Sequence, residues 1–308
     1  MEHFKLNLES NFKFDDIVVA LGNFDGFHIG HQKLISELNN VKLNKGYKSA
    51  VFLFVNHTKD LIFNQNFSRI MSFEDKLKKL ESFKIDYVFS IDFSEKIKSL
   101  TPIEFLDFLT INLNVKHIVV GKDYRFSKNR EGNIDFIESY MKEKQLSCTI
   151  IEKLSYDNNE ISSTKIIEYI KTGKIELANT MLGDYFSIKG KVIQGFQRGR
   201  NLGYPTANLD MSFNYVMVKE GVYLTKTIVD GKEYFSFSSV GHNPTFDNKK
   251  STIESHIFDF HEDIYGKDIE LCFLKRLRDN IKFNSIEELI EQLKKDEIKC
   301  RELINEYK

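Results

Sequence analysis

Short apolar runs alternate with amphipathic segments along the first half of the chain. Runs typical of strands occupy 17–22, 49–55, 86–91, 117–121 and 148–153, and helical spacing occupies 31–40, 72–83, 101–111 and 134–146. Because these strands are continuously apolar, the pattern predicts a parallel sheet covered by helices on both faces. Ligands of such sheets bind outside the carboxyl ends of the strands.

The pattern changes after about residue 180. Strand-like runs now follow one another without helices between them, at 185–194, 221–229, 233–241, 252–260 and 268–277. This succession predicts an antiparallel barrel or sandwich. The last segment, 285–308, has helical spacing and begins at Ser285 with Glu288 three residues later, which predicts a helix opened by a capping box.

The length of 308 residues favours two domains, at about 100–200 residues per domain. We expect their junction within 181–185, where the pattern changes, so that the domains are 1–182 and 183–308.

Charge and cysteine content narrow the class of protein. The 44 Lys and Arg residues nearly balance 45 Asp and Glu residues, so no overall positive field attracts nucleic acid. No apolar run approaches the roughly 20 residues of a membrane span, and no secretion leader is visible. Cys148, Cys272 and Cys300 are too scattered for a disulfide framework or a zinc site. We expect a cytoplasmic monomer or weak homo-oligomer without nucleic-acid or membrane partners.

The stretch GNFDGFHIGH, residues 22–31, follows the first apolar strand and leads into a helix. Glycines permit a tight turn there, and a helix amino terminus attracts anions. His28 and His31 lie three residues apart, so they can share a helix face and donate hydrogen bonds to a phosphate. Two alternatives remain open: surface histidines at a helix cap, or a zinc pair that lacks a third ligand.

The longer stretch GNFDGFHIGHQKLI resembles the histidine motif of nucleotidyltransferases, in the form found in bacterial bifunctional riboflavin kinase/FAD synthetases. The resemblance implies a Rossmann-like FMN adenylyltransferase domain in which His28 and His31 stabilise the α-phosphate of ATP and the departing pyrophosphate. It also implies that the nucleotide site is lined by Gly22, Asn23, Phe24 and Gly26.

Three further segments are similar to motifs of this family. VGKDYRFSKNREG (120–132), ISSTKII (161–167) and FVNHT (54–58) correspond to family loops that bind ATP or flavin. The resemblance implies ATP contacts from Asp123, Arg125, Ser162, Ser163 and Thr164, and flavin contacts from His57 and Phe126. The chain departs from the family pattern at Ser127, where glycine is usual, and at Ile167, where arginine is usual. In FVNHT, which resembles the family's F-D-P-H-P, His57 is kept and both prolines are lost.

The stretch GFQRGRNLGYPTANL, residues 195–209, combines three glycines and two arginines with a hydroxyl and an amide two positions apart. In an extended segment Thr206 and Asn208 point the same way, so both can face one hard cation such as Mg²⁺. The alternative is a turn-rich loop of the barrel without a ligand. The chain has no G-x-x-x-x-G-K-[ST] phosphate loop.

The second half resembles the riboflavin kinase domain of the same family through PTAN (205–208), IESHIFDF (253–260), DIYGK (263–267) and LRDNIKF (277–283), among other segments. The resemblance implies that Glu254 is the base that deprotonates the ribityl 5′-hydroxyl and that Thr206 and Asn208 hold Mg-ATP. It implies further ATP contacts from Gly199 and Gly203, and flavin contacts from Arg278 and Phe283.

Glu254 suits the role of a base because its strand alternates, which places it opposite Ile253 and Ile257. A solvent-facing strand residue without a role is the alternative.

The sequence therefore predicts a bifunctional enzyme that phosphorylates riboflavin to FMN and adenylylates FMN to FAD, with ATP as co-substrate and Mg²⁺ as cofactor. Two alternatives stay open. The departures at Ser127, at Ile167 and in FVNHT would fit a working kinase joined to a weakened adenylyltransferase. A flavin-binding regulator without turnover is the other.

Overall fold

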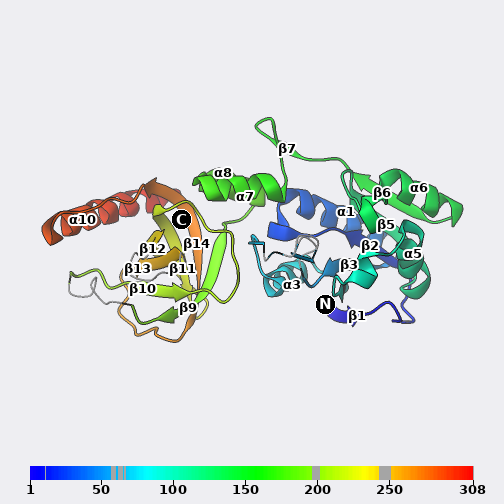
Figure 1. Cartoon of the computed structure of the whole chain (residues 1–308), viewed down its shortest axis with the longest axis horizontal. Coiled ribbons are helices and arrows are strands. Elements are labelled where there is room, and N and C mark those ends of the chain that lie inside the picture. The colour runs from blue at the N-terminus through cyan, green and yellow to red at the C-terminus, as the bar shows by residue number, and fades with distance from the viewer. Residues whose placement is uncertain are drawn as a thin grey trace. The chain divides into compact units, whose positions relative to one another are not determined.

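The structure of the chain is a computed structural model that describes residues 1–307, except 11, 57–59, 62–64, 66, 196–201 and 243–250. The chain divides into two compact units, Met1–Phe67 with Ser72–Ser163 and Ser68–Met71 with Thr164–Lys308. Figure 1 labels most helices and strands of both units.

The first unit is built on a six-stranded sheet. Its strands are β1 (Glu2–Leu6), β2 (Ile17–Leu21), β3 (Lys48–Phe54), β4 (Tyr87–Ile91), β5 (Val115–Gly121) and β6 (Ser147–Ile151). They run in the order β1-β4-β3-β2-β5-β6, and each neighbouring pair is parallel. The predicted parallel sheet is confirmed. Strand β1 was not predicted, and it extends the sheet beyond β4.

Helices connect these strands. They are η1 (Asp25–Phe27), α1 (Ile29–Lys45), α3 (Phe73–Ser82), α4 (Glu95–Lys98), α5 (Pro102–Asp107), η2 (Phe108–Asn112), η3 (Lys128–Arg130) and α6 (Ile134–Glu143), and a small hairpin pairs β7 (Ser155–Tyr156) with β8 (Asn159–Glu160). Alternate strand residues are buried on both sides of the sheet: Val19 and Leu21 join the core that includes α5 and α6, whereas α1 contacts β2 from the other side.

Helices α3 and α5 begin directly after the polar N-cap residues that the sequence indicated, Ser72 and Thr101. Ser72 accepts a hydrogen bond at its Oγ from the Asp75 amide at 3.1 Å. Thr101 and Glu104 exchange reciprocal bonds as a capping box, with Pro102 in the first turn of α5. These side chains satisfy amide groups that have no partner within a helix, which fixes where each helix begins.

The second unit is a closed antiparallel barrel with helices. It contains α7 (Ser163–Thr172, whose first residue belongs to the first unit), α8 (Ile175–Leu182), β9 (Ser187–Ile193), β10 (Ala207–Asp210), β11 (Gly221–Val229), β12 (Lys232–His242), β13 (Ser251–Ile257), β14 (Asp268–Arg278), α10 (Ile286–Leu303) and η4 (Ile304–Glu306). The barrel closes in the order β10-β13-β12-β11-β14-β9, so of the two predicted architectures the barrel is confirmed.

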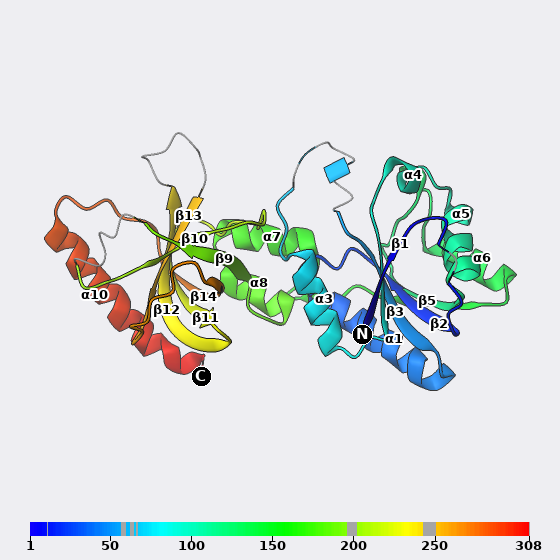
Figure 2. The ribbon, with the colours of Figure 1, turned by 90° about the horizontal axis from the view of Figure 1, so that it is seen from below.

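Helix α10 passes along the outside of the barrel (Figure 2). Its buried residue Cys300 and the following Ile304 join an apolar cluster with barrel residues such as Leu224 and Leu274. Ser285 caps the helix by accepting from the Glu288 amide at 3.2 Å. The Glu288 carboxylate accepts from the Asn284 amide at 2.9 Å, so the return bond of the predicted capping box comes from one residue earlier.

The barrel interior holds a cluster of hydroxyls. Thr225 bonds Ser236 at 2.7 Å and Ser238 at 2.8 Å, Thr227 bonds Ser236 at 2.8 Å, and Ser238 donates to Ser255 at 3.0 Å. All five side chains are fully buried. Their mutual hydrogen bonds remove the cost of burying polar groups in a core.

One short segment of the first half belongs to the second unit. Residues Ser68–Met71 group with the barrel, where the Arg69 amide donates to the Asn214 carbonyl at 3.0 Å and the Val216 amide donates to the Arg69 carbonyl at 2.8 Å. Helices α7 and α8 also group mainly with the barrel. The functional boundary between 182 and 183 stays a prediction.

Candidate active sites

The connection between β2 and α1 begins at the topological switch point of the sheet. Strand β2 pairs with β3 on one side and with β5 on the other, and the chain runs outward to β4 before it returns to β5. Loops that leave β2 and β5 therefore start from neighbouring carboxyl ends, where open parallel sheets bind their ligands. These loops carry the predicted histidine motif and the segment that contains Asp123.

The turn after β2 has an unusual backbone. Phe24, Gly26 and Phe27 have φ angles of 49°, 77° and 44°. Glycine adopts positive φ easily, but the two phenylalanines do so at a cost that the surrounding packing must offset. Both rings are almost completely buried, at 0% and 1% exposure. Packing therefore fixes the turn and, with it, the start of α1.

His28 and His31 are brought together as predicted. Their rings stack with centroids 3.7 Å apart and planes inclined by 16°. His28 is the N-cap of α1, and its Nδ1 accepts a hydrogen bond from the His31 amide at 3.3 Å. That bond uses the lone pair of Nδ1, so in the neutral ring the proton is on Nε2, which is a donor.

Burial keeps both imidazoles neutral in the free protein. Loss of water contact lowers the pKa of His28 to about 4. Burial also lowers the pKa of His31 well below its usual value, and repulsion from protonated His28 and from the positive charge of Lys76 would lower it further. His28 is 7% exposed, so the alternative of two surface histidines is wrong, although His28 does cap the helix.

Other predicted residues of this half lie close to the turn. Ser163, the first residue of α7, donates from Oγ to the Asp25 carbonyl at 2.9 Å. The charge of Asp123 raises the pKa of His28, in opposition to burial. Asp123 also forms an ion pair with Lys153 at 3.3 Å. The loops after β2 and β5 and the start of α7 therefore meet around one imidazole pair.

The remaining predicted residues of this half differ in accessibility. Gly22 and Ser162 are partly buried, Gly26 is buried, and Asn23, Arg125 and Thr164 are exposed. Arg125 donates to the carbonyl of Tyr124 at 3.2 Å. His57 lies outside the described residues.

Phe126 is a core residue in the structure. Its ring is 7% exposed and lies 5.4 Å from the ring of Phe105 and 5.7 Å from that of Tyr124. A Cβ atom at Gly132 would approach the Phe126 ring to 2.5 Å, so glycine is required there. The flavin contact expected of Phe126 stays a prediction.

Two residues that sequence reasoning missed also belong to this site. Lys76 of α3 is 8% exposed and donates from Nζ to the Asn23 carbonyl at 3.0 Å. A Cβ atom at Gly30 would lie 3.1 Å from Nδ1 of His28, so the glycine leaves room for that ring. The glycine between the two histidines was a visible signal. Lys76 gave none, because a lysine in an amphipathic helix usually faces solvent.

The predicted residues of the second half meet across β10 and β13. Asn208 and Glu254 are ladder partners, and Thr206 donates from Oγ1 to Oε2 of Glu254 at 3.3 Å. Ile253 and Ile257 are buried whereas Glu254 is exposed, so the predicted alternation is confirmed. A Cβ atom at Gly195 would lie 2.4 Å from Nδ2 of Asn208, which shows that the amide packs directly against this glycine.

The other predicted residues of the second half are farther along the chain. Arg278 forms a bidentate pair with Asp296 of α10, with Nε to Oδ1 at 2.9 Å and Nη2 to Oδ2 at 2.5 Å. Phe283 is partly exposed between β14 and α10. Gly203 has a φ of 83°, a value that favours glycine, and Gly199 lies outside the described residues. Flavin contacts of Arg278 and Phe283 stay predictions.

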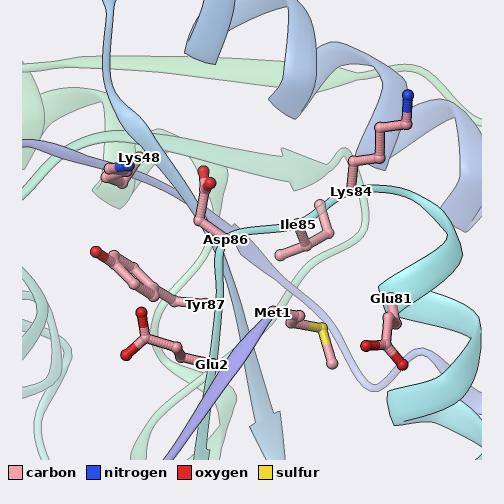
Figure 3. A pocket seen from close by; sticks show the side chains of 8 residues that line it. All are labelled: Met1, Glu2, Lys48, Glu81, Lys84, Ile85, Asp86 and Tyr87. Carbon is pink, nitrogen blue, oxygen red and sulfur yellow. The ribbon is translucent and has the colours of Figure 1, made fainter.

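A separate depression lies at the opposite end of the parallel sheet (Figure 3). It has a volume of about 330 Å³ and is lined by Met1, Glu2, Lys48, Glu81, Lys84, Ile85, Asp86 and Tyr87. Glu2, Lys48 and Tyr87 are at the amino ends of their strands, away from the histidine pair. The depression therefore belongs to neither candidate site.

Neither a zinc site nor a membrane span is found in the described part of the chain. Its described residues contain no group of three or more His, Cys, Asp or Glu side chains that could hold a metal ion. None of the helices among them has the length and apolar character that crossing a bilayer requires.

Comparison with protein families gives two matches that cover most of the chain. Residues 11–165 match the FAD synthetase family and residues 182–304 match the riboflavin kinase family. A bifunctional riboflavin kinase/FMN adenylyltransferase of Bacillus subtilis is 37% identical over 284 residues, covering 91% of this chain and 90% of the relative. The protein of the same name from Escherichia coli is 31% identical over 288 residues, with 92% of each chain covered.

A solved structure agrees with this fold over almost its whole length. A crystal structure titled as a macrolide-efflux protein from Streptococcus pneumoniae has a TM-score of 0.90 and 32% sequence identity. The match covers 98% of this chain and 99% of that chain.

Proposed function

The chain belongs to the family of bifunctional riboflavin kinase/FMN adenylyltransferases, and we propose that His28 and His31 serve its adenylyl transfer and the Thr206–Asn208–Glu254 cluster its kinase reaction. The chain is an enzyme of flavin cofactor biosynthesis that uses ATP for both steps. Relatives named for both activities match about nine-tenths of the chain. This coverage does not favour either alternative from the sequence, a kinase with a weakened adenylyltransferase or a regulator without turnover.

In adenylyl transfer, a phosphate oxygen of FMN attacks the α-phosphorus of ATP, and the bond to the β-phosphate breaks so that pyrophosphate leaves. The nucleophile is already an anion, so no general base is needed. The stacked imidazoles, 3.7 Å apart, donate hydrogen bonds to the oxygens that gain charge. The amino end of the 17-residue helix α1 adds its positive dipole to the same place.

In the kinase reaction, Glu254 accepts the proton of the ribityl 5′-hydroxyl while the oxygen attacks the γ-phosphorus of ATP and ADP leaves. The single observation that carries this assignment is the 3.3 Å contact between Thr206 and Glu254, which joins an expected ATP contact to the expected base. An exposed carboxylate on a strand face is accessible to a substrate alcohol.

Members of this family are ATP-dependent and generally use a divalent metal, which we propose to be Mg²⁺. The residues fit such an ion, because the Thr206 hydroxyl and the Asn208 amide offer hard oxygen ligands and Gly195 leaves room for that amide. When bound with ATP, Mg²⁺ would neutralise part of the phosphate charge. Thr206 and Asn208 would orient the nucleotide relative to Glu254.

The test is a product assay on the full-length protein with ATP and Mg²⁺, started separately from riboflavin and from FMN. Glu254→Gln should lower FMN formation by at least about 100-fold, as expected for loss of a general base, and should still convert FMN to FAD. His31→Asn should show the reverse pattern. Exposed residues supply matched controls, Glu233→Gln and His261→Asn, which should leave both steps unchanged.

Two outcomes would contradict the assignment. Undiminished FMN formation by Glu254→Gln would exclude this carboxylate as the base. Wild-type protein that forms FMN but never FAD would favour the kinase-only alternative instead.

A further inference from the structure

His256 lies two residues beyond Glu254 on β13 and shares its side of the strand, since Ser255 between them is buried in the barrel. Its Nδ1 is 2.8 Å from the carbonyl oxygen of Pro205. A carbonyl oxygen can only accept, so Nδ1 carries the proton and donates. The bond links the strand that holds Glu254 to the residue just before Thr206.

The imidazole of His256 is held by aromatic rings as well as by this bond. Its centroid lies 5.1 Å from the Tyr204 ring at an angle of 63°, and 5.2 Å from the ring of Phe237. The ring of Phe258 is 6.0 Å away. These contacts leave the ring little freedom, so the position of Nδ1 is well defined.

The bond falls where the strand ladder ends. Ladder pairing between β10 and β13 covers Ala207 with Ser255 and Asn208 with Glu254. Thr206 precedes that ladder and reaches Glu254 through one side-chain bond of 3.3 Å. Pro205 has no amide hydrogen, so its carbonyl is its only main-chain group that can form a hydrogen bond. The ladder therefore fixes the backbone after Thr206, and the bond from His256 to the Pro205 carbonyl fixes the backbone before it.

We propose that His256 is a positioning residue of the kinase site, which holds Pro205 so that the Thr206 hydroxyl lies against Glu254. The proposal rests on the proposed role of Thr206, Asn208 and Glu254. His256 does not touch the reacting atoms in this proposal. It acts through the Pro205 carbonyl, and its loss would let the Thr206 hydroxyl move away from the base.

The test compares two substitutions in the full-length enzyme. His256→Phe keeps an aromatic ring and removes the donor, whereas His256→Asn keeps an N–H donor near the place of Nδ1. Mutation of a residue that orients a metal site through another group typically costs about 10–100-fold in activity or metal affinity. We therefore expect His256→Phe to lower kcat for FMN formation and to raise the apparent KM for Mg-ATP, with a combined effect of about 10–100-fold. His256→Asn should recover most of the loss.

Two measurements and a matched control separate positioning from a general loss of structure. Riboflavin affinity, followed by flavin fluorescence, and conversion of supplied FMN to FAD should stay near wild type in both variants. The matched control is His261→Phe, at an exposed position of the same unit, and it should change neither kcat nor the KM for Mg-ATP.

The proposal is overturned if His256→Phe forms FMN at the wild-type rate, or if the Asn and Phe variants are equally impaired. It is also overturned if the KM values for riboflavin and Mg-ATP rise together, because a disordered barrel would give that result. A wild-type enzyme that forms no FMN would instead contradict the proposed function itself.

Discussion

Ser127 stands where the family that the chain resembles usually has glycine, and its backbone explains that preference. Its φ and ψ angles are 63° and −175°, a region that is almost confined to glycine. Its hydroxyl is also buried without a hydrogen-bond partner among the described residues. The loop therefore keeps a backbone conformation that favours glycine, and the Cβ atom of Ser127 makes that conformation strained.

We expect Ser127→Gly to stabilise the protein by about 1 kcal/mol, because it removes the backbone strain and the unsatisfied hydroxyl. Urea unfolding followed by circular dichroism measures the change. Ser94→Gly is the contrasting variant, since Ser94 caps α4 with a negative φ and should lose stability when replaced. Destabilisation by Ser127→Gly would show that the serine is not strained.

His28 should titrate far below an ordinary histidine. Because burial lowers its pKa from 6.5 to about 4, the unfolded chain binds a proton in this interval that the folded protein does not. The free energy of unfolding therefore falls as the pH drops from about 6.5 to about 4, by about 3 kcal/mol from this group. Nuclear magnetic resonance of the imidazole protons measures the midpoint.

The control for this titration is His28→Asn, which can still cap α1 and lacks the titrating ring. The resonance that titrates near 4 should disappear from its spectrum. A midpoint near 6.5 for His28 in the folded protein would contradict the buried, neutral pair.

Helix α10 is joined to the barrel by the ion pair between its buried Asp296 and the partly buried Arg278, as well as by apolar packing. Asp296 is 5% exposed and holds Arg278 through two oxygens. Gln292 donates to the same carboxylate at 2.8 Å. Removing one partner of such a pair leaves a charge without compensation in a poorly solvated place, which is more costly than losing a surface pair.

We expect Asp296→Ala to destabilise the protein by about 3 kcal/mol, measured by chemical denaturation. Glu291→Ala on the same helix is the matched control, because Glu291 pairs with Lys295 at 2.8 Å between largely exposed side chains. That pair should contribute less than about 1 kcal/mol. Equal effects of the two substitutions would show that Arg278 does not depend on Asp296.

At the scale of elements, continuous apolar runs predicted the central strands correctly. Both faces of these strands are buried, so nearly every residue along them is apolar. The same rule missed β1, Glu2–Leu6, whose burial is mainly limited to Leu6. The helix predicted for 101–111 is divided into α5 and a π-helical turn, Phe108–Asn112. No periodicity in the sequence marks that change of winding.

For the candidate sites, motifs predicted which residues meet but not what else reaches them. The stack of His28 on His31 and the contact of Thr206 with Glu254 follow from spacing within a helix start and across a strand pair. Lys76 comes from a helix 45 residues after His31, and only tertiary packing brings it to Asn23. Contacts of this kind leave no local pattern in a sequence.

At the scale of the whole molecule, each proposed site draws its residues from its own part of the chain, so the two reactions should be separable. A mixture of the Glu254→Gln and His31→Asn variants should therefore form FAD from riboflavin and ATP, after a lag that shortens as protein concentration rises. Chromatography of the products over time measures this. Either variant alone is the control and should form far less FAD from riboflavin than the mixture does.

Absence of FAD from the mixture, when each variant carries out its remaining step, would contradict this expectation. It would mean that FMN formed by one molecule does not reach another.

The segment Ser68–Met71 has a consequence for anyone who divides this protein. The polypeptide enters the barrel unit at residue 68, leaves it after residue 71 and returns at residue 164. A fragment that starts at 164 or at 183 would lack the backbone groups of Arg69 that bond Asn214 and Val216. No single cleavage point yields two intact units. Low stability or low activity of a truncated kinase fragment would therefore reflect the loss of residues 68–71 from the barrel unit, and would not show that the kinase depends on the adenylyltransferase unit.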